Sequence, residues 1–508
     1  MSGEDRGSDR CTQSRLPSRS QSGEKPSSPH NGPQLTRNDE RAIGLLEQFG
    51  HTATAFQVLA PGMCHWFTTD AASNPPDTNI HQQLADSVLT DARDLGMVGY
   101  VDTGAAWVVA GEPIAARDDT INVAEAFVNY AHSQKKRVAF FATEGALSAS
   151  PRFRRVLIGE QPTWNPVEWP AILARNRSLR EQLRRARAKG VCVRTVTGSE
   201  FVGVRDELTR LVKRWLAARP MASMHFLVEL EPFVHLEARQ LFVAERDGAV
   251  IAFLSCAPVS ARNGWLFEHL LRDPKAPNGS AELLVDHAMR SFAAEGVTWT
   301  TLGLAPLAGP VAGWLRATRT LARPFFNFRG LAAFKKKLGP STWEPIYLAY
   351  PRERSSVLAM RDGLRAFAGG SLIAFGIRTV LRGPKPLLSA LEFSLLPWTL
   401  ALSLWPAVPW FPFTALKWMW VAFDVGLLAA LYLLRKKWTQ QLAIGIATAV
   451  SIDTALTVAQ AVTWNISRTR TALEALMVVI ACSGPALAAA VLWGAVKRRS
   501  VIDTVSVR

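Results

Sequence analysis

The chain has 508 residues, which is too many for one ordinary hydrophobic core, so we expect two or more folding units. Its net charge of +16 first suggests a nucleic-acid partner, but residues 353–508 carry 16 Lys/Arg against 7 Asp/Glu beside apolar segments, which is typical of membrane anchoring. The five cysteines are scattered and form no CxxC pair, which argues against a zinc site, so no metal ligands are expected.

Residues 1–38 are rich in Ser, Gly, Pro and charge, which predicts a disordered N-terminal tail. They hold no apolar run long enough for a secretory signal. From residue 39 to 352 the pattern mixes helices and strands, including a strand pair around a turn at 102–104 and a basic helix at 176–190. The order helix, three strands, loop, helix and strand after residue 200 is typical of an α+β domain whose sheet opens around a ligand.

The stretch 270–309 reads as a loop, an amphipathic helix and a strand. Asn278, Gly279 and Ser280 stand at the expected helix N-terminus, where backbone N–H groups and the helix dipole favour phosphate. Glu282 lies in the first turn of the same helix and opposes an anion there. This conflict suggests that the loop serves a positively charged ligand group instead of phosphate.

Residues 353–386 are expected to be a juxtamembrane linker, and 387–499 a membrane region followed by a cytoplasmic tail at 500–508. Four apolar stretches, each near the ~20 residues that span a bilayer, are predicted transmembrane helices. They are 387–405, 415–434, 441–463 and 473–496. Basic residues before the first, between the second and third, and after the last predict that both termini are cytoplasmic. A buried soluble helical bundle is the alternative.

Asp424 and Asp453 fall near the middles of the second and third predicted spans. A carboxylate at the bilayer centre costs about 2.5 to 3.5 kcal/mol, so both are expected to face the bundle interior at similar depth, with these two spans packed together. Their role is either to stabilise the bundle or to line a polar path for a lipid head group.

Five segments together resemble the catalytic domain of the bacterial multiple peptide resistance factors, the phosphatidylglycerol lysyltransferase family. They are "AGEPIAARDD" (110–119), "FLSCAPVS" (253–260), "RDPKAPNGSAELL" (272–284), "TLGLAPLAG" (301–309) and "FNFRGLAAFKKKLGPSTWEPIYLAYPR" (326–352). The resemblance implies an α+β fold of two fused acetyltransferase-like (GNAT-like) domains, at 39–200 and 201–352. It also implies a transferase that moves an aminoacyl group from aminoacyl-tRNA to phosphatidylglycerol or a related lipid, without a cofactor, at the cytoplasmic leaflet of the bacterial inner membrane.

Three features depart from the family pattern. The acidic residue Glu268 is followed by His269-Leu270-Leu271, where the family usually has an arginine. Phe326 stands where a tyrosine is usual. The family's larger membrane part precedes its catalytic domain, whereas here the apolar stretches follow it.

Candidate site residues follow from the chemistry and from the resemblance. Glu268 and Glu282 are expected to border one cleft and bind the aminoacyl ammonium, with Asp286 nearby; the alternative is that Glu282 complements the helix dipole and Asp286 pairs with Arg290. Cations interleaved with aromatics suit a nucleotide or a lipid phosphate, although the same pattern fits a solvated basic face. These candidates are Phe328, Arg329, Lys335 and Lys337.

Two further predictions remain open. His225 is a possible proton acceptor for the lipid hydroxyl, or a hydrogen-bonded structural histidine. The basic helix can follow a tRNA backbone, lie on anionic lipid, or be an ordinary exposed helix. Its candidate contacts are Arg177, Arg180, Arg184 and Arg185.

Two other functions compete with aminoacyl transfer. An acyl-coenzyme A dependent N-acyltransferase would share the fold but prefers a glycine-rich pyrophosphate loop, and "DPKAPNGSAE" offers one glycine and an acid. A noncatalytic membrane scaffold with a degenerate transferase domain would account for Leu271 and Phe326.

Overall fold

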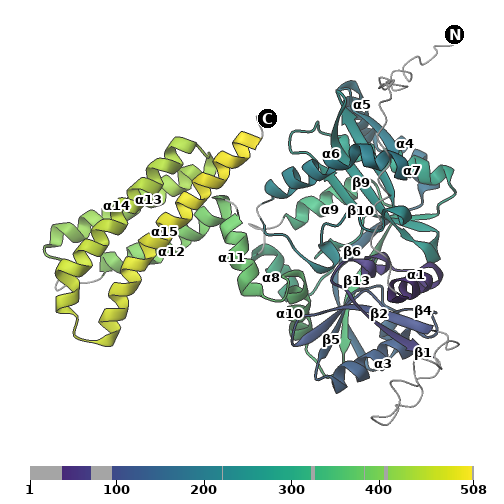
Figure 1. The fold of residues 1–508 in the computed structure, drawn as a ribbon, viewed down its shortest axis with the longest axis horizontal. Helices are drawn as coiled ribbons and strands as arrows, with labels where there is room; N and C mark the ends of the chain where they lie inside the picture. Colours follow the sequence, from purple (N-terminus) through teal and green to yellow (C-terminus); the bar gives the residue numbers. More distant parts are fainter. Residues whose placement is uncertain are drawn as a thin grey trace, which may run out of the picture. The chain divides into compact units, whose positions relative to one another are not determined.

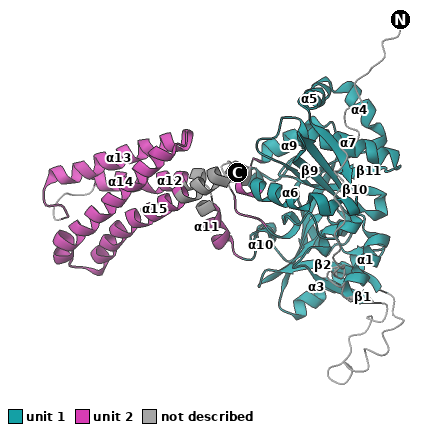
Figure 2. Cartoon of the chain, turned by 45° about the horizontal axis from the view of Figure 1, so that its top comes forward, with its two compact units in different colours: residues 1–215, 225–319, 328–370 teal, residues 216–224, 320–327, 371–508 magenta. Residues whose placement is uncertain are grey.

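A computed structural model of the chain describes residues 37–69, 94–219, 221–321, 327–382, 384–404 and 410–505. The predicted disordered tail therefore lies, except for its last two residues, outside the described residues, as does Phe326. The chain divides into two compact units (Figure 2). Unit 1 comprises Met1–Trp215, His225–Arg319 and Phe328–Gly370, and unit 2 comprises Leu216–Met224, Thr320–Asn327 and Ser371–Arg508.

Unit 1 is built on one continuous mixed sheet (Figure 1). Its strand order is β1-β2-β3-β5-β13-β6-β11-β10-β9-β8-β7, with β4 paired to β2 and β12 paired to β6. The strands are β1 (Cys64–Thr69), β2 (Asp94–Asp102), β3 (Ala106–Ala110), β4 (Ile114–Ala115), β5 (Arg137–Thr143), β6 (Phe153–Trp164), β7 (Cys192–Val196), β8 (Gln240–Arg246), β9 (Ala249–Val259), β10 (Gly264–Arg272), β11 (Trp299–Thr301), β12 (Ala305–Pro306) and β13 (Thr342–Pro351).

Helices pack on both faces of this sheet. They are α1 (Arg37–Phe49), α3 (Thr120–Ser133), α4 (Trp169–Arg175), α5 (Arg177–Ala188), α6 (Gly198–Ala217), α7 (Ser280–Ala294), α8 (Gly313–Leu321), α9 (Phe328–Lys337) and α10 (Ser356–Phe367), with short 3₁₀ turns that include η1 (Ala55–Leu59) and η7 (Ser260–Arg262). The alternation of β8 explains the two layers. Phe242 joins the core under α5 and α7, whereas its neighbours Leu241 and Val243 join the core under α6.

Three strands, β13, β6 and β7, pair across the two halves of the α+β sequence. β13, near the end of the α+β sequence, pairs antiparallel with β5 and with β6, and β6 also pairs with β11. β7, which precedes residue 200, pairs with β8. The segments 39–200 and 201–352, proposed as separate domains, therefore exchange strands within one sheet. α10, within the expected linker, is fixed to β5 by a bidentate ion pair between Arg137 and Asp362, with Nη2 and Oδ1 2.7 Å apart.

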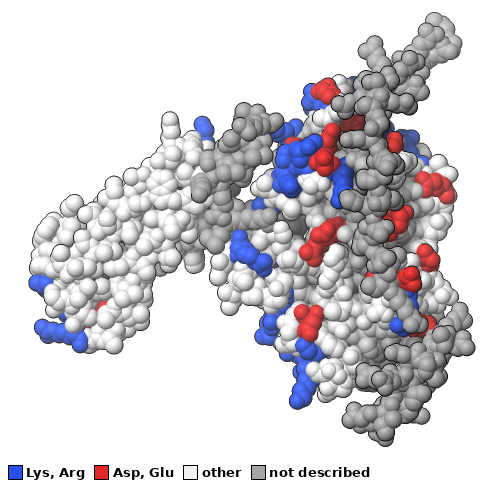
Figure 3. Space-filling model, in the orientation of Figure 1, with Lys and Arg blue, Asp and Glu red and all other residues white. Residues whose placement is uncertain are grey.

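Unit 2 is helical, and most of it consists of α11 (Leu372–Arg382), α12 (Pro384–Leu404), α13 (Thr414–Lys436), α14 (Gln440–Gln460) and α15 (Ala472–Val505). Within the described residues, three helical stretches are long and apolar enough to cross a membrane: Thr414–Lys436, Gln440–Arg468 and Ala472–Val496. The first of the four predicted spans is a shorter apolar helix, Leu388–Leu404. In the view of Figure 3, charged side chains are spread over unit 1 and are few on unit 2.

Candidate functional site

Glu268 occupies an irregular position on β10. The pairing of β10 with β9 shifts register between Phe267 and His269, so Glu268 is the extra residue of a β-bulge. Its side chain is 9% exposed and forms an ion pair with Arg239, with Oε2 and Nη1 2.5 Å apart. Gln57 of η1 donates to Oε1 at 2.8 Å. Burial opposes ionisation of Glu268, but His269, Arg239 and the hydrogen bonds outweigh it and lower the pKa of this carboxyl.

Glu282 has different partners. Its Oε1 accepts from Gln182 of α5 at 2.9 Å and from Lys337 Nζ of α9 at 3.0 Å, and its side chain is 8% exposed. Lys337 also contacts the Gln182 side-chain oxygen. Glu282 therefore ties the start of α7 to α5 and α9.

The two glutamates lie on opposite faces of the sheet. Phe267 packs against Phe292 of α7, with ring centroids 5.8 Å apart. Glu268 instead contacts Arg239, whose guanidinium lies 5.0 Å from the ring centroid of Phe56 on the side of the sheet away from α7. The structure therefore does not bring Glu268 and Glu282 together in one cleft, because alternation along β10 places Glu268 on the face opposite Phe267 and α7.

The loop before α7 is closed by α5. Gly279 has φ +100°, and a Cβ there would lie 2.9 Å from the backbone oxygen of Gln182. Ser280 is fully buried and donates to the Pro277 carbonyl at 2.8 Å, while Asn278 accepts from Arg272 at 3.1 Å. The helix N-terminus that looked like a phosphate site is thus packed against a neighbouring helix.

Asp286 is a packing residue. It is 1% exposed and accepts from Trp169 Nε1 at 2.8 Å, from Arg187 at 2.6 Å and from Arg290 at 3.1 Å. The alternative interpretation, a pair with Arg290 one turn away, agrees with this geometry. Three donors on one buried carboxylate connect α4, α5 and α7.

Lys335 of α9 is the most unusual charged group in unit 1. It is 4% exposed, and its Nζ donates to the backbone carbonyls of Leu302, Gly303 and Leu304 at 2.7 to 2.8 Å. These carbonyls lie where the chain leaves β11, the strand that pairs with only the first part of β10. Burial lowers the pKa of Lys335 to about 7.

The other predicted basic and polar residues are spread over the surface. Arg329 and Arg177 are exposed, and within the described parts of the chain their side chains form no hydrogen bond or ion pair. Phe328, at the start of α9, is half-buried. Arg180 donates to the Leu173 carbonyl at 2.6 Å, and Arg184 and Arg185 both contact Glu181, at 2.8 and 2.9 Å. His225 is 39% exposed and contacts Glu229 through Nδ1 at 3.1 Å.

A charged cluster that the sequence analysis missed lies at the middle of the sheet, where the halves meet. We call it the central acidic cluster: His51, Glu112, Glu144, Gln161, Arg262 and Glu344. Arg262 of η7 forms ion pairs with Glu144 and with Glu344, the latter at 3.4 Å. Gln161 of β6 donates to the same two carboxylates at 3.2 and 2.8 Å.

Glu112 fixes the backbone of the turn that carries Glu144. Its Oε1 accepts three consecutive backbone N–H groups, those of Glu144, Gly145 and Ala146, at 2.9 to 3.1 Å. Its Oε2 lies 3.4 Å from His51 Nε2, and the interaction with this carboxylate raises the pKa of His51. Glu112 therefore fixes the turn after β5 that presents Glu144.

The cluster has more carboxylates than cations. Burial raises the pKa of Glu144; Arg262 opposes this rise, and Glu112 and Glu344 add to it. Glu344 keeps 33% of its side-chain exposure, so the cluster reaches solvent. Glu112 and Glu344 both lie in segments that carried the family resemblance, as the middle residues of Gly-Glu-Pro and Trp-Glu-Pro. These two motifs are the sequence feature from which the cluster could have been predicted.

The fold and the cluster describe an α+β protein whose two halves share one sheet and meet at a charged centre. Residues 71–350 match the family model described as phosphatidylglycerol lysyltransferase, C-terminal. The chain belongs to this family.

Relatives of known structure have the same fold. The C-terminal domain of a putative lysylphosphatidylglycerol synthetase from Agrobacterium fabrum is 23% identical, with a TM-score of 0.53, and the match covers 66% of this chain and 98% of that one. L-PGS from Bacillus licheniformis is 20% identical, with a TM-score of 0.53 and coverage of 67% and 97%. The expected α+β fold class is confirmed.

Phosphatidylglycerol lysyltransferase of Bacillus subtilis is 25% identical over 265 residues, which is 50% of this chain and 31% of that protein. The chain therefore matches about a third of the length of this relative.

Proposed function

We propose that the chain is a membrane-anchored aminoacyltransferase that moves an aminoacyl group from aminoacyl-tRNA to phosphatidylglycerol or a related lipid. The observation that carries this proposal is the family match over residues 71–350 in a chain whose described residues also include three helices long and apolar enough to cross a membrane. In this proposal unit 1 and both termini face the cytoplasm of a bacterial cell, as the basic residues flanking the apolar helices suggest. This orientation requires the shorter apolar helix, Leu388–Leu404, to cross the membrane together with the three longer ones.

The closed N-terminus of α7 supports aminoacyl transfer over the coenzyme A alternative. A pyrophosphate needs free N–H groups and open space at a helix N-terminus. Here the backbone of Gln182 approaches Gly279, and Glu282 with its Lys337 partner fills the first turn. An acyl-coenzyme A donor would have to displace α5.

The central acidic cluster is our candidate for recognition of the aminoacyl ammonium. Glu144 and Glu344 share Arg262, and Glu344 is partly exposed, so an incoming cation can add a charge-assisted hydrogen bond there. Glu268, which the sequence analysis proposed for this task, already has Arg239 and Gln57 as partners. We assign Glu268 and Glu282 to positioning instead.

Phosphate recognition is assigned to exposed cations. Arg329 and Arg177 are exposed, and a guanidinium suits a phosphate of either the tRNA end or the lipid. Lys335 acts as a positioning residue in this proposal, because its ammonium holds the three carbonyls of the loop that leaves β11.

The reaction exchanges one ester for another. The lipid hydroxyl oxygen forms a bond to the aminoacyl carbonyl carbon, the bond from that carbon to the tRNA ribose oxygen breaks, and the hydroxyl proton ends on the ribose oxygen. No ATP is required, so the chain must only position the two substrates, exclude water and stabilise developing charge. His225, half-exposed beside Glu229, remains a candidate for accepting the lipid proton.

Site variants test the assignment in membranes that contain the full chain. With tRNA charged with labelled amino acids, E144Q and E344Q should each lower lipid labelling more than tenfold, which corresponds to about 1.4 kcal/mol of lost transition-state stabilisation. The matched control is E353Q, because Glu353 is exposed and forms no hydrogen bond or ion pair with the described residues of the cluster. Labelling by E144Q and E344Q at the level of E353Q would remove the cluster from the site.

A further inference from the structure

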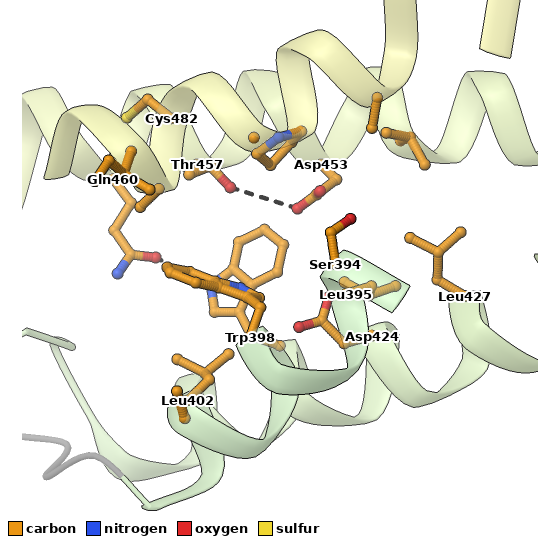
Figure 4. Close-up of a pocket in the computed structure, with 18 of the residues that line it drawn as sticks. Ser394, Leu395, Trp398, Leu402, Asp424, Leu427, Asp453, Thr457, Gln460 and Cys482 are labelled. Atoms are coloured by element: carbon orange, nitrogen blue, oxygen red, sulfur yellow. Dashed lines mark hydrogen bonds between the residues drawn. The ribbon is translucent and has the colours of Figure 1, made fainter. Parts of the chain in front are cut away.

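A cavity of about 440 Å³ lies within unit 2, among α12, α13, α14 and α15. Its walls are mainly apolar, with Leu, Val, Ala, Ile and Met side chains. Two acids interrupt this lining, Asp424 of α13 and Asp453 of α14 (Figure 4). The expectation that both acids face the bundle interior is confirmed, although α13 packs mainly on α12 and α14 mainly on α15.

The two carboxylates have weak internal partners. Asp424 and Asp453 are 7% and 8% exposed. Each accepts one hydrogen bond from a neutral hydroxyl at 3.4 Å, Asp424 from Thr399 and Asp453 from Thr457. None of the described residues that line the cavity is Lys, Arg or His. By contrast, Glu392 on the same helical unit pairs with Arg435 at 3.1 Å.

Acids at this depth are expensive to insert and usually mark a binding site or an ion pathway. Two acids on one cavity without a lining cation form a site that is complementary to positive charge. Trp398, Trp410 and Trp420 also line the cavity, and aromatic faces attract ammonium groups. Gln460 holds this aromatic side in place, because its Oε1 accepts from Trp420 Nε1 at 3.0 Å and its Nε2 donates to the Trp410 carbonyl at 3.2 Å.

We propose that this cavity binds an amphiphile with an ammonium group, which the carboxylates of Asp424 and Asp453 hold while its apolar chain follows the Leu and Ala side chains of α12 and α15. The negative charge of Asp424 and Asp453 favours the ammonium group, and the apolar lining of the cavity favours the hydrocarbon chain of the ligand. That the natural ligand is an aminoacylated lipid rests on the proposed function; the cation-binding cavity itself does not.

The test measures binding of tritiated hexadecylamine and of tritiated hexadecanol to the full chain in nonionic detergent micelles. The protein should bind the amine at least tenfold more tightly than the alcohol. D424N/D453N, which keeps the shape of both side chains and removes their charge, should lose this preference. E474Q should keep it, because Glu474 lies outside the cavity, at the start of α15, where it accepts the backbone N–H groups of Arg470 and Thr471. Equal preference in D424N/D453N and in the unmodified chain would overturn the proposal.

A second variant tests whether the ligand lies in the cavity, because it keeps both carboxylates and changes only the volume of the cavity. L427W keeps both acids and fills the cavity that Leu427 lines, so it should weaken binding of the amine and the alcohol alike. Unchanged amine binding by L427W would also overturn the proposal, because the ligand would then lie elsewhere.

The natural ligand is tested by competition with lysyl-phosphatidylglycerol and with phosphatidylglycerol. The aminoacylated lipid should displace hexadecylamine at a concentration at least tenfold lower. A chain that keeps its amine preference but labels no lipid from charged tRNA would contradict the proposed function and leave the cavity site standing. A chain that labels lipid fully but has no amine preference would contradict the cavity site alone.

Discussion

Lys335 shows how a single residue can hold a loop by backbone contacts alone. Its ammonium donates to three consecutive carbonyls, so each of its N–H bonds has an acceptor even though no carboxylate is among its hydrogen-bond partners. Burial still disfavours its charged form, which brings its pKa to about 7. The charge on this lysine therefore changes near neutral pH. The same lysine holds the Leu302–Leu304 loop through its three hydrogen bonds.

The lowered pKa has a consequence for stability. Between about pH 7, the pKa of Lys335 in the folded chain, and its ordinary value of 10.5, the unfolded chain binds more protons than the folded one. The free energy of unfolding should therefore rise with pH over this range. Urea unfolding of the full chain in detergent, followed by near-ultraviolet circular dichroism, measures the slope.

K335M should remove this pH dependence and lower stability at pH 7 by about 1 to 3 kcal/mol, because it takes the ammonium donor from the carbonyls of the half-buried residues Leu302, Gly303 and Leu304. K336M is the matched control, since the neighbouring Lys336 is exposed. An identical slope in K335M and K336M would show that Lys335 does not titrate as described.

At the scale of elements, the contact between α5 and α7 decides what the loop before α7 can bind. Gln182 and Ala186 of α5 lie within 3.2 Å of where a Cβ on Gly279 would stand. Asp286 and Glu282 add polar links from α7 to α5, through Arg187 and Gln182. This packing is the physical reason that a phosphate-like loop is closed.

Two glycine substitutions separate backbone strain from close packing. Gly190 and Gly279 both have positive φ, +78° and +100°, but a Cβ at Gly190 meets nothing within 4 Å. G190A should therefore cost only the ~1 kcal/mol of a left-handed alanine. G279A should cost about 2 kcal/mol more, because its methyl group collides with the Gln182 backbone. Equal losses in urea unfolding would mean that α5 moves away freely.

Local elements could be predicted from the sequence, but the way they meet could not. The periodic helix at 280–294 and the strands around it were expected, since their pattern depends on near neighbours. The insertion of β13 between β5 and β6 depends on contacts about two hundred residues apart, and no local pattern encodes it. Three of the four expected apolar spans are long enough to cross a membrane, and the first is shorter.

The candidate site shows the same limit. Alternation along β10 places Glu268 and Phe267 on opposite faces, but it does not reveal the bulge at Glu268 or its partners Arg239 and Gln57. The central acidic cluster gathers residues from the turn after β5 and from β6, η7 and β13, whose side chains approach each other only once the halves share a sheet. Glu112 and Glu344 were visible in the sequence, but their partners were not.

At the scale of the whole molecule, one chain combines a family fold with apolar helices. Unit 1 has the fold of the phosphatidylglycerol lysyltransferase C-terminal family, and the described part of unit 2 contains three helices long and apolar enough to cross a membrane. A transferase that takes a water-soluble donor and a lipid acceptor needs both properties, because the acceptor never leaves the bilayer. The central claim of our account is therefore the transfer itself.

The most direct measurement supplies membranes containing the full chain with total tRNA charged with labelled amino acids and follows label in extracted lipid. We predict labelled lipid that is absent when the charged tRNA is first digested with RNase, and that is absent from membranes without the chain. Lipid labelling that survives RNase digestion, or no lipid labelling with any charged amino acid, would contradict transfer from tRNA to lipid.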